Sequence, residues 1–118
     1  RHEVITHSNI LSIRVDESLY FANAAFLEEL VYAQVDKVPQ VEHVILMCPA
    51  INSVDLSALD ALEDINSRLR ERGIAFHLSE VKGPVMDMLR RSQFLERLAG
   101  KVFLQHHSAV TELTQTSQ

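Results

Sequence analysis

The chain has 118 residues and a formal net charge of −5 at pH 7, and 47% of its residues are hydrophobic. This length and composition are typical of one soluble domain, and the negative charge disfavours a nucleic-acid surface, which needs clustered positive charge. The single cysteine, Cys48, excludes an internal disulfide framework. No apolar run reaches the length of a membrane span, so we expect no direct membrane insertion. Because the chain begins at Arg1 rather than Met, we interpret it as a piece of a longer protein.

The first fifteen residues predict an antiparallel hairpin. Residues 1–7 form a short edge strand in this prediction, and Ser8 and Asn9 form the turn. Apolar Leu11 and Ile13 alternate with polar residues, which is typical of a half-buried strand. A hairpin at the start places antiparallel pairing at one edge of the sheet.

A helical period begins at Ala24, with Asn23 as the predicted N-cap and Pro39 as the stop. The spacing of apolar residues predicts one buried stripe. Its members are Phe26, Leu27, Leu30, Val31 and Val35.

The middle of the chain predicts two buried strands with a helix between them. Residues 44–48 are apolar throughout, which favours a central strand covered on both faces, with Cys48 as a small buried hydrophobe. The helix that follows ends at Arg72, where Gly73 is placed to cap it, and residues 74–78 form the next strand. The apolar stripe of this helix contains Leu59, Leu62, Ile65 and Leu69.

The last third of the chain predicts shorter elements. A helix starts with Pro84 at its first position and breaks near Ser92. A short strand is predicted at 102–104, and Ser108 caps a terminal helix. Strands and helices thus alternate after the hairpin, which predicts a single α/β domain over residues 1–118. Its sheet is mixed and mainly parallel, with an N-terminal antiparallel hairpin and about four helices.

Sequence motifs for catalysis and metal binding are lacking. The three glycines are scattered and form neither a dinucleotide-binding fingerprint nor a phosphate-binding loop. No nucleophile-elbow motif surrounds Ser53 or Ser57, so hydrolysis is not supported. The six histidines show no metal-ligand spacing. His77 is interpreted as a core histidine, and His106 and His107 as part of a loop. We therefore predict no catalytic residues, no metal and no cofactor.

The stretch 51–59 lies between the central strand and the following helix. Ser57 with Asp60 three residues later predicts a capping box, and Asp55 adds the negative charge that a helix N-terminus favours. The alternative is functional: an exposed Ser57 hydroxyl at a helix start would serve as a phosphoacceptor or as part of an anion site.

A receiver-type phosphoacceptor is a further alternative. In this hypothesis Asp55 would share a divalent cation with Asp16 and Glu17, which follow the second strand. The initial hairpin, however, departs from the regular strand–helix alternation of receiver domains.

The order of elements resembles the STAS domain, named for sulfate transporters and anti-sigma-factor antagonists. Residues 55–59, Asp-Leu-Ser-Ala-Leu, occupy the place where antagonists carry Asp-Ser-Ser-Gly-Leu with a phosphorylated second serine. Asp55 and Ser57 match this motif, while Leu56 and Ala58 replace its Ser and Gly. The resemblance implies a phosphoacceptor or anion-binding turn formed by Asp55, Ser57 and Ala58.

A second segment resembles one branch of that family. Residues 18–24, Ser-Leu-Tyr-Phe-Ala-Asn-Ala, look like the segment after the second strand in STAS domains of SulP transporters. The candidate interaction surface contains Tyr20, Phe21, Asn23 and Asp60. Tyr20 and Phe21 are also expected to plug the first helix onto the sheet.

The resemblance implies a non-catalytic regulatory domain of a SulP-type transporter of sulfate or a related anion. Such a domain lies at the cytoplasmic face of the plasma membrane and is soluble as an isolated fragment. Its expected partners are the transmembrane domain of the parent protein and a regulatory protein or nucleotide. The alternatives are a free-standing anti-sigma-factor antagonist switched at Ser57 and a small-anion or nucleotide-binding module.

Overall fold

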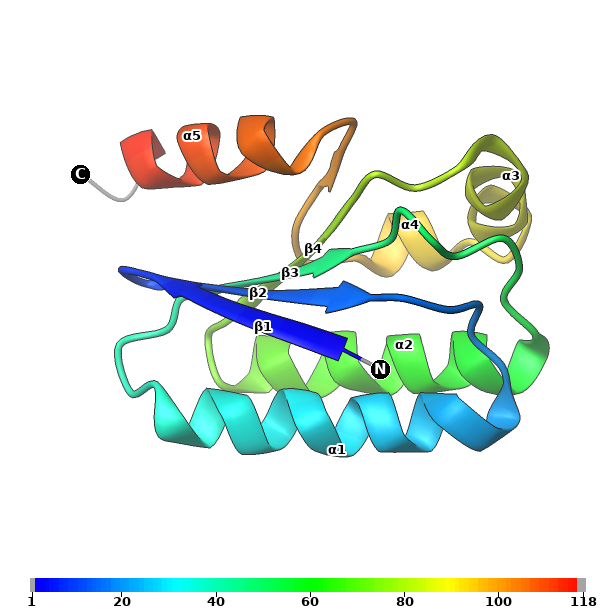
Figure 1. Ribbon diagram of the computed structural model, residues 1–118, viewed down its shortest axis with the longest axis horizontal. Helices are drawn as coiled ribbons and strands as arrows, with labels where there is room; N and C mark the ends of the chain where they lie inside the picture. The colour runs from blue at the N-terminus through cyan, green and yellow to red at the C-terminus, as the bar shows by residue number, and fades with distance from the viewer. Residues whose placement is uncertain (1, 117–118) are drawn as a thin grey trace.

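A five-stranded sheet with the strand order β1-β2-β3-β4-β5 runs through the middle of the molecule (Figure 1). The computed structural model describes residues 2–116. The strands are β1 (His2–His7), β2 (Ile10–Val15), β3 (His43–Met47), β4 (Ala75–Ser79) and β5 (Val102–Phe103). β1 pairs antiparallel with β2, and every other pair of neighbours is parallel. The predicted mixed α/β fold is confirmed.

Within residues 2–116, five helices connect and cover these strands. They are α1 (Phe21–Lys37), α2 (Leu56–Glu71), α3 (Gly83–Arg91), α4 (Phe94–Arg97) and α5 (His106–Thr116). Figure 1 shows α1 and α2 side by side under one face of the sheet, whereas α5 lies across the opposite face. No helix within residues 2–116 combines the length and the hydropathy that a membrane crossing requires.

β3 is apolar on both faces because both faces are covered. Val44 and Leu46 belong to the large core between the sheet and helices α1 and α2, while Ile45 and Met47 belong to a smaller cluster between the sheet and α5. This confirms the prediction of a central strand, and Cys48 is buried as expected.

The predicted stop of α2 is also confirmed. Gly73 has a φ of +74°, a left-handed conformation that glycine adopts without steric cost. The N–H of Gly73 donates to the carbonyl of Arg70 at 2.9 Å, and the N–H of Ile74 donates to that of Leu69 at 2.8 Å. These two bonds form a Schellman motif.

Several predicted element boundaries are wrong. α1 begins at Phe21, and Asn23 is its third residue rather than its N-cap. α5 begins at His106, so Ser108 lies inside it and the two neighbouring histidines are helical. Pro84 is the second residue of α3, and Leu104 lies outside β5. At two of these starts a side chain that is not the N-cap satisfies the backbone: Asn23 accepts the N–H of Tyr20 before α1, and Glu80 accepts the N–H of His106 at the first residue of α5.

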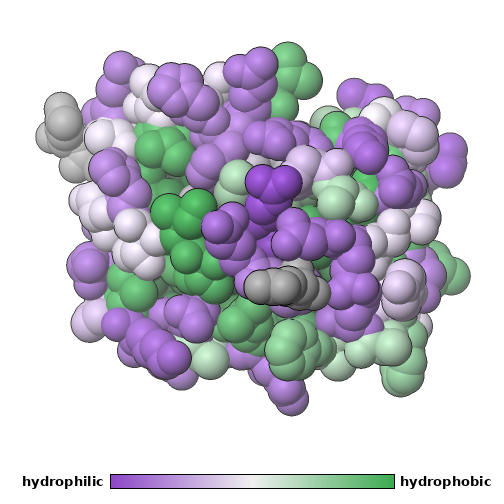
Figure 2. Space-filling view, viewed as in Figure 1, coloured by the Kyte–Doolittle hydropathy of each residue, from purple (hydrophilic) through white to green (hydrophobic). Residues whose placement is uncertain are grey.

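One predicted core residue lies on the surface. Phe26 is 60% exposed and stacks on the ring of His2, with 5.9 Å between ring centroids. Figure 2 shows apolar surface over β1 and the adjoining part of α1, and the exposed Ile5 belongs to the same strand as His2. Leu27, Val31 and the other members of the predicted stripe contact the core.

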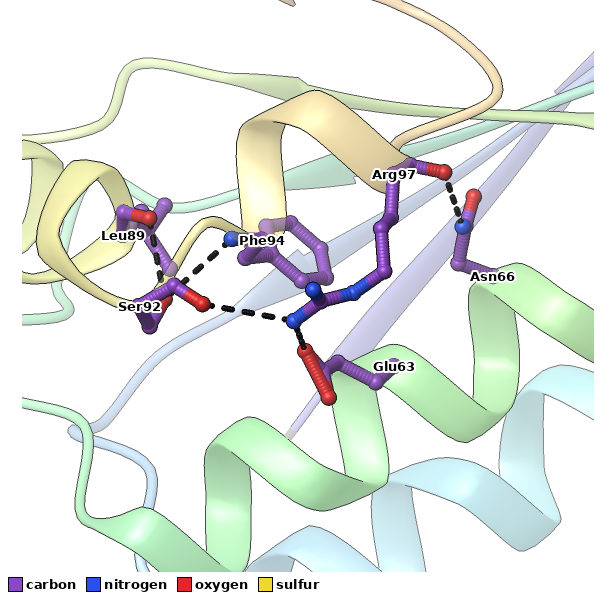
Figure 3. A network of polar contacts seen from close by, with 6 residues as sticks. All are labelled: Glu63, Asn66, Leu89, Ser92, Phe94 and Arg97. Carbon is purple, nitrogen blue, oxygen red and sulfur yellow. Dashed lines mark hydrogen bonds and ion pairs between the residues drawn. The ribbon is translucent and has the colours of Figure 1, made fainter.

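A polar network fixes α4 against α2 (Figure 3). The Nδ2 group of buried Asn66 donates to the carbonyl of Arg97 at 2.8 Å, and its Oδ1 accepts from the N–H of Ala99 at 2.9 Å. The guanidinium of Arg97 reaches Glu63 on α2 and the carbonyl of Ser92 before α4. The predicted helix break near Ser92 is confirmed, because α3 ends at Arg91 and α4 begins at Phe94.

Candidate interaction site at the starts of α1 and α2

The loops that precede α1 and α2 are joined by backbone hydrogen bonds. The N–H of Leu19 donates to the carbonyl of Ser53 at 3.1 Å, and the N–H of Asp55 donates back to the carbonyl of Leu19 at 3.2 Å. The Ser18 hydroxyl oxygen accepts the N–H groups of Asn52 and Ser53. These contacts hold the two helix N-termini next to each other.

Asp55 is the N-cap of α2 and also binds the start of α1. Its Oδ1 accepts the N–H of Ala58 at 2.8 Å, and its Oδ2 accepts the N–H of Phe21 at 3.1 Å. One carboxylate thus satisfies a free backbone donor of each helix and lies where both helix dipoles favour negative charge.

The capping box predicted for Ser57 and Asp60 is wrong, because the cap position belongs to Asp55. Ser57 is the second residue of α2, and its side chain is exposed. Ala58 is fully buried in the first helical turn, a backbone conformation in which Ala needs no glycine-like freedom. The turn expected from these residues is therefore a helix start with an accessible hydroxyl.

The prediction that Tyr20 and Phe21 pack the first helix onto the sheet is wrong. Phe21 is 74% exposed and Tyr20 is also exposed, whereas buried Leu19 fills the core position. Asn23 has a structural role: its Oδ1 accepts the N–H of Tyr20 at 3.0 Å and its Nδ2 donates to the carbonyl of Ser18.

A groove with a volume of 270 Å³ runs between the first halves of α1 and α2. It brings together two predicted surface residues, Phe21 and Asp60, with Ser57. The complete lining is Phe21, Ala24, Ala25, Glu28, Ser57, Asp60, Ala61 and Asp64. Tyr20 and Asn23 lie outside this lining.

Every charged side chain of the groove lining is acidic. Asp60 and Asp64 form no ion pair with any residue in the range 2–116. The hydroxyl of Tyr32 donates a hydrogen bond to the carboxylate of Glu28 at 2.8 Å. Burial, together with the hydrogen bond and charge of Glu28, raises the pKa of that hydroxyl. The guanidinium of Arg68 lies 5.1 Å from the centroid of the Tyr32 ring, beyond the groove.

A second polar cluster lies on the α5 face of the sheet. The N–H of Lys101 donates to Nδ1 of His77 at 3.0 Å, so the proton of this neutral ring is on Nε2, which lies 3.0 Å from Nδ1 of His43. Burial lowers the pKa of His77 to about 4, and the neighbouring charges of His43 and Lys101 act in the same direction. His77 is 3% exposed and both its ring nitrogens are bonded, which confirms the predicted core histidine.

Histidine and carboxylate side chains do not converge on a metal site. Within residues 2–116, no group of three His, Cys, Asp or Glu side chains lies close enough to hold a metal ion. Asp16 pairs with Arg14 at 3.1 Å, and the two oxygens of Asp55 are bound by backbone N–H groups. The three-carboxylate arrangement of the receiver hypothesis is therefore not formed.

Sequence reasoning missed three features of this site. The second hydrogen bond of Asp55 and the role of Ser18 both link segments more than thirty residues apart, which local patterns cannot show. The third is the exposure of Leu56, which is 75%. A signal for it existed, because Leu56 lies outside the apolar stripe of α2.

Comparisons with known proteins agree with this architecture. The family model of the STAS domain matches residues 1–109. The chain is 37% identical over 86 residues to "Probable sulfate transporter Rv1739c" of Mycobacterium tuberculosis, a match that covers 72% of the chain and 15% of that protein.

Two solved structures share the fold. Murine Solute Carrier 26 family member A9, an anion transporter, superposes with a TM-score of 0.81 at 22% identity, over 92% of this chain and 18% of that one. The anti-sigma factor antagonist SpoIIAA in its unphosphorylated form gives a TM-score of 0.72 at 12% identity, over 97% and 98% of the two chains.

The chain spans only a small part of its curated relatives, 17% of a sulfate transporter of Arabidopsis thaliana and 15% of the mycobacterial protein. The family match, by contrast, covers nearly all of the chain, and the observed sheet and helices are those that the STAS resemblance implies. The chain therefore belongs to the STAS domain family.

Proposed function

We propose that this chain is the regulatory domain of a SulP-type secondary transporter of sulfate or a related anion, and that it performs no chemistry of its own. The observation that carries the proposal is the match to a sulfate transporter, which covers 72% of this chain but 15% of the transporter. Such proportions are those of one domain within a larger membrane protein.

In this proposal the domain lies at the cytoplasmic face of the plasma membrane and contacts the transmembrane part of the same protein. The groove between α1 and α2 is the contact surface. Phe21 lines the groove and is exposed, and Leu56 is exposed at the first position of α2, outside the groove lining. Large apolar side chains that stay exposed are typical of interaction sites.

The proposal is tested by uptake of radiolabelled sulfate in cells that express the full-length parent protein. The double substitution Phe21→Ser with Leu56→Ser removes the exposed apolar contacts, and we expect it to reduce uptake severalfold at equal protein level. Phe26→Ser is the matched control, since Phe26 is an exposed phenylalanine of the same helix outside the groove. Equal uptake by all three proteins, or a parent gene that encodes no membrane region, would refute the proposal.

A second candidate function is a switch by phosphorylation of Ser57, as in a free-standing anti-sigma-factor antagonist. The observation that favours it is the exposed Ser57 hydroxyl in the first turn of α2, where backbone N–H groups and the helix dipole stabilise a phosphate. Asp60 and Asp64 oppose it by charge repulsion. Incubation with a cognate kinase should incorporate one phosphate into the wild type and none into Ser57→Ala; no incorporation into either protein would count against it.

A small-anion or nucleotide site at the same place is the least favoured candidate. Both oxygens of Asp55 already bind the N–H groups of Phe21 and Ala58, and the adjoining groove is acidic. Calorimetric titration with sulfate, bicarbonate, ATP and GTP should therefore give no binding heat.

A further inference from the structure

The groove between α1 and α2 combines an apolar floor with an acidic rim. Three alanines, Ala24, Ala25 and Ala61, line it with small side chains, and Phe21 flanks it with most of its ring exposed. Small residues between two helices leave space for a side chain supplied from outside. Exposed Leu56 extends the apolar surface at the start of α2.

The rim of the groove carries three carboxylates, and within residues 2–116 neither Asp60 nor Asp64 forms an ion pair. Glu28 lies on the α1 side, and Asp60 and Asp64 lie one turn apart on the α2 side. The nearest basic side chain along α2 is Arg68, which is held over the ring of Tyr32. Several like charges around one depression produce a local field that attracts cations.

The same arrangement disfavours an anionic occupant. Helix N-termini normally attract anions, but the carboxylate of Asp55 already occupies this position between α1 and α2. A phosphate or sulfate in the groove would have to approach Asp60 and Asp64 closely without a compensating basic side chain.

We infer that the groove receives a basic, amphipathic segment of the membrane part of the parent protein, an inference that rests on the proposed function and adds the chemistry of the contacting segment. An apolar side chain of this segment fills the space over the alanines and contacts Phe21. Lys or Arg side chains beside it form charge-assisted hydrogen bonds with Asp60 and Asp64. Complementary charge also sets the orientation of the segment between the two helices.

The probe for this inference is a synthetic helical peptide with Leu on one face and Lys on the other. Its charge-inverted twin carries Glu at every Lys position. Each peptide is titrated into the isotope-labelled 118-residue chain, and amide chemical shifts report where it binds. The Lys peptide should shift the amide signals of Ala24, Ala25 and Ala61, and the Glu peptide should leave them unchanged.

Two pairs of charge substitutions test whether peptide binding depends on the carboxylates of the groove or on the net negative charge of the chain. Asp60→Asn with Asp64→Asn should weaken binding of the Lys peptide about fivefold at low salt, since each exposed charge pair contributes modestly. Glu71→Gln with Glu96→Gln removes the same charge from exposed positions outside the groove and should leave the Kd unchanged. Phe21→Ala, which keeps every carboxylate, should also weaken binding.

The inference is overturned if the Glu peptide shifts the groove amides equally, if the Lys peptide shifts amides elsewhere, or if the double Asn variant keeps the wild-type Kd. Failure of the inference about a basic segment is distinguishable from failure of the proposed function. Loss of uptake in the Phe21→Ser and Leu56→Ser parent, together with a negative peptide titration, would leave the interaction role intact and remove only the basic partner.

Discussion

The carboxylate of Asp55 accepts the backbone N–H of Phe21 at 3.1 Å, so the residue that caps α2 also binds the first residue of α1. The two residues are 34 positions apart. The backbone hydrogen bonds of Leu19 to Ser53 and Asp55 reinforce this contact, so the two helix starts are joined beside the groove.

Asp55→Ala should lower the free energy of unfolding by about 2 kcal/mol, since it removes an N-cap and a second hydrogen bond to a backbone donor. Urea denaturation measures this difference. Asp60→Ala is the control, because Asp60 is an exposed carboxylate that caps neither helix. Equal stability of the two variants would show that the two-helix cap contributes nothing.

Asn66→Ala should lower the free energy of unfolding by about 2 kcal/mol, because the N–H of Ala99 loses its buried acceptor while the carbonyl of Arg97 keeps only its bond from Arg70. Thermal and urea unfolding provide the measurement. The neighbouring exposed position offers a comparison, since Ser67→Ala should change the stability very little. A loss below that of Ser67→Ala would contradict the network in Figure 3.

The stability of the fold should depend on the protonation of His77. Burial lowers its pKa from the ordinary value of 6.5 to about 4, so the unfolded state binds the proton more readily than the folded state. The contribution of neutral His77 to the free energy of unfolding is therefore fully present above pH 6.5. It decreases by up to about 3 kcal/mol as the pH falls from 6.5 towards 4.

His77→Gln tests this pH dependence, because Gln can accept from Lys101 and donate to His43 without taking up a proton. Urea unfolding at pH 7.5 and 4.5 should show a smaller acid loss for His77→Gln than for the wild type. His7→Gln, at an exposed site, should behave as the wild type does. Identical acid losses in all three proteins would exclude His77 as the source.

Cys48 should be unreactive in the folded protein. Its thiol is buried, donates to the carbonyl of Leu46, and has a pKa that burial raises to about 12. A thiol reagent at pH 8 should react with it only after unfolding. A cysteine introduced by Leu104→Cys, at a position that is 85% exposed, should react immediately, and an equally fast native Cys48 would contradict the buried position.

The fold was predictable because its signals are local and periodic. The apolar run at residues 44–48 predicts β3, and the apolar stripe with the glycine at position 73 predicts α2 and its end. The alternation of strands and helices then predicts the sheet. The spacing of Phe26 fits the apolar stripe of α1 and therefore predicts a core residue, but its side chain is exposed and stacks on His2 of β1, a long-range contact that local spacing cannot indicate.

The candidate site was predictable in its location but not in its construction. Phe21, Ser57 and Asp60 could be selected from the sequence, and the groove unites them. The role of Asp55 could not, because a sequence indicates a cap for the helix that follows and not for a helix 34 residues earlier. The spacing of Ser57 and Asp60 matches that of a capping box, but it lies two residues after the observed N-cap, Asp55.

The most direct test of the central claim, that the starts of α1 and α2 form a contact surface, is the rate of maleimide labelling at Leu56→Cys. Leu56 is 75% exposed, and buried Cys48 should not compete for the reagent. The introduced cysteine should label rapidly in the 118-residue chain and at least about tenfold more slowly in the full-length parent protein, whereas Leu104→Cys should label equally in both. Equal labelling of Leu56→Cys in the chain and in the parent would contradict the account.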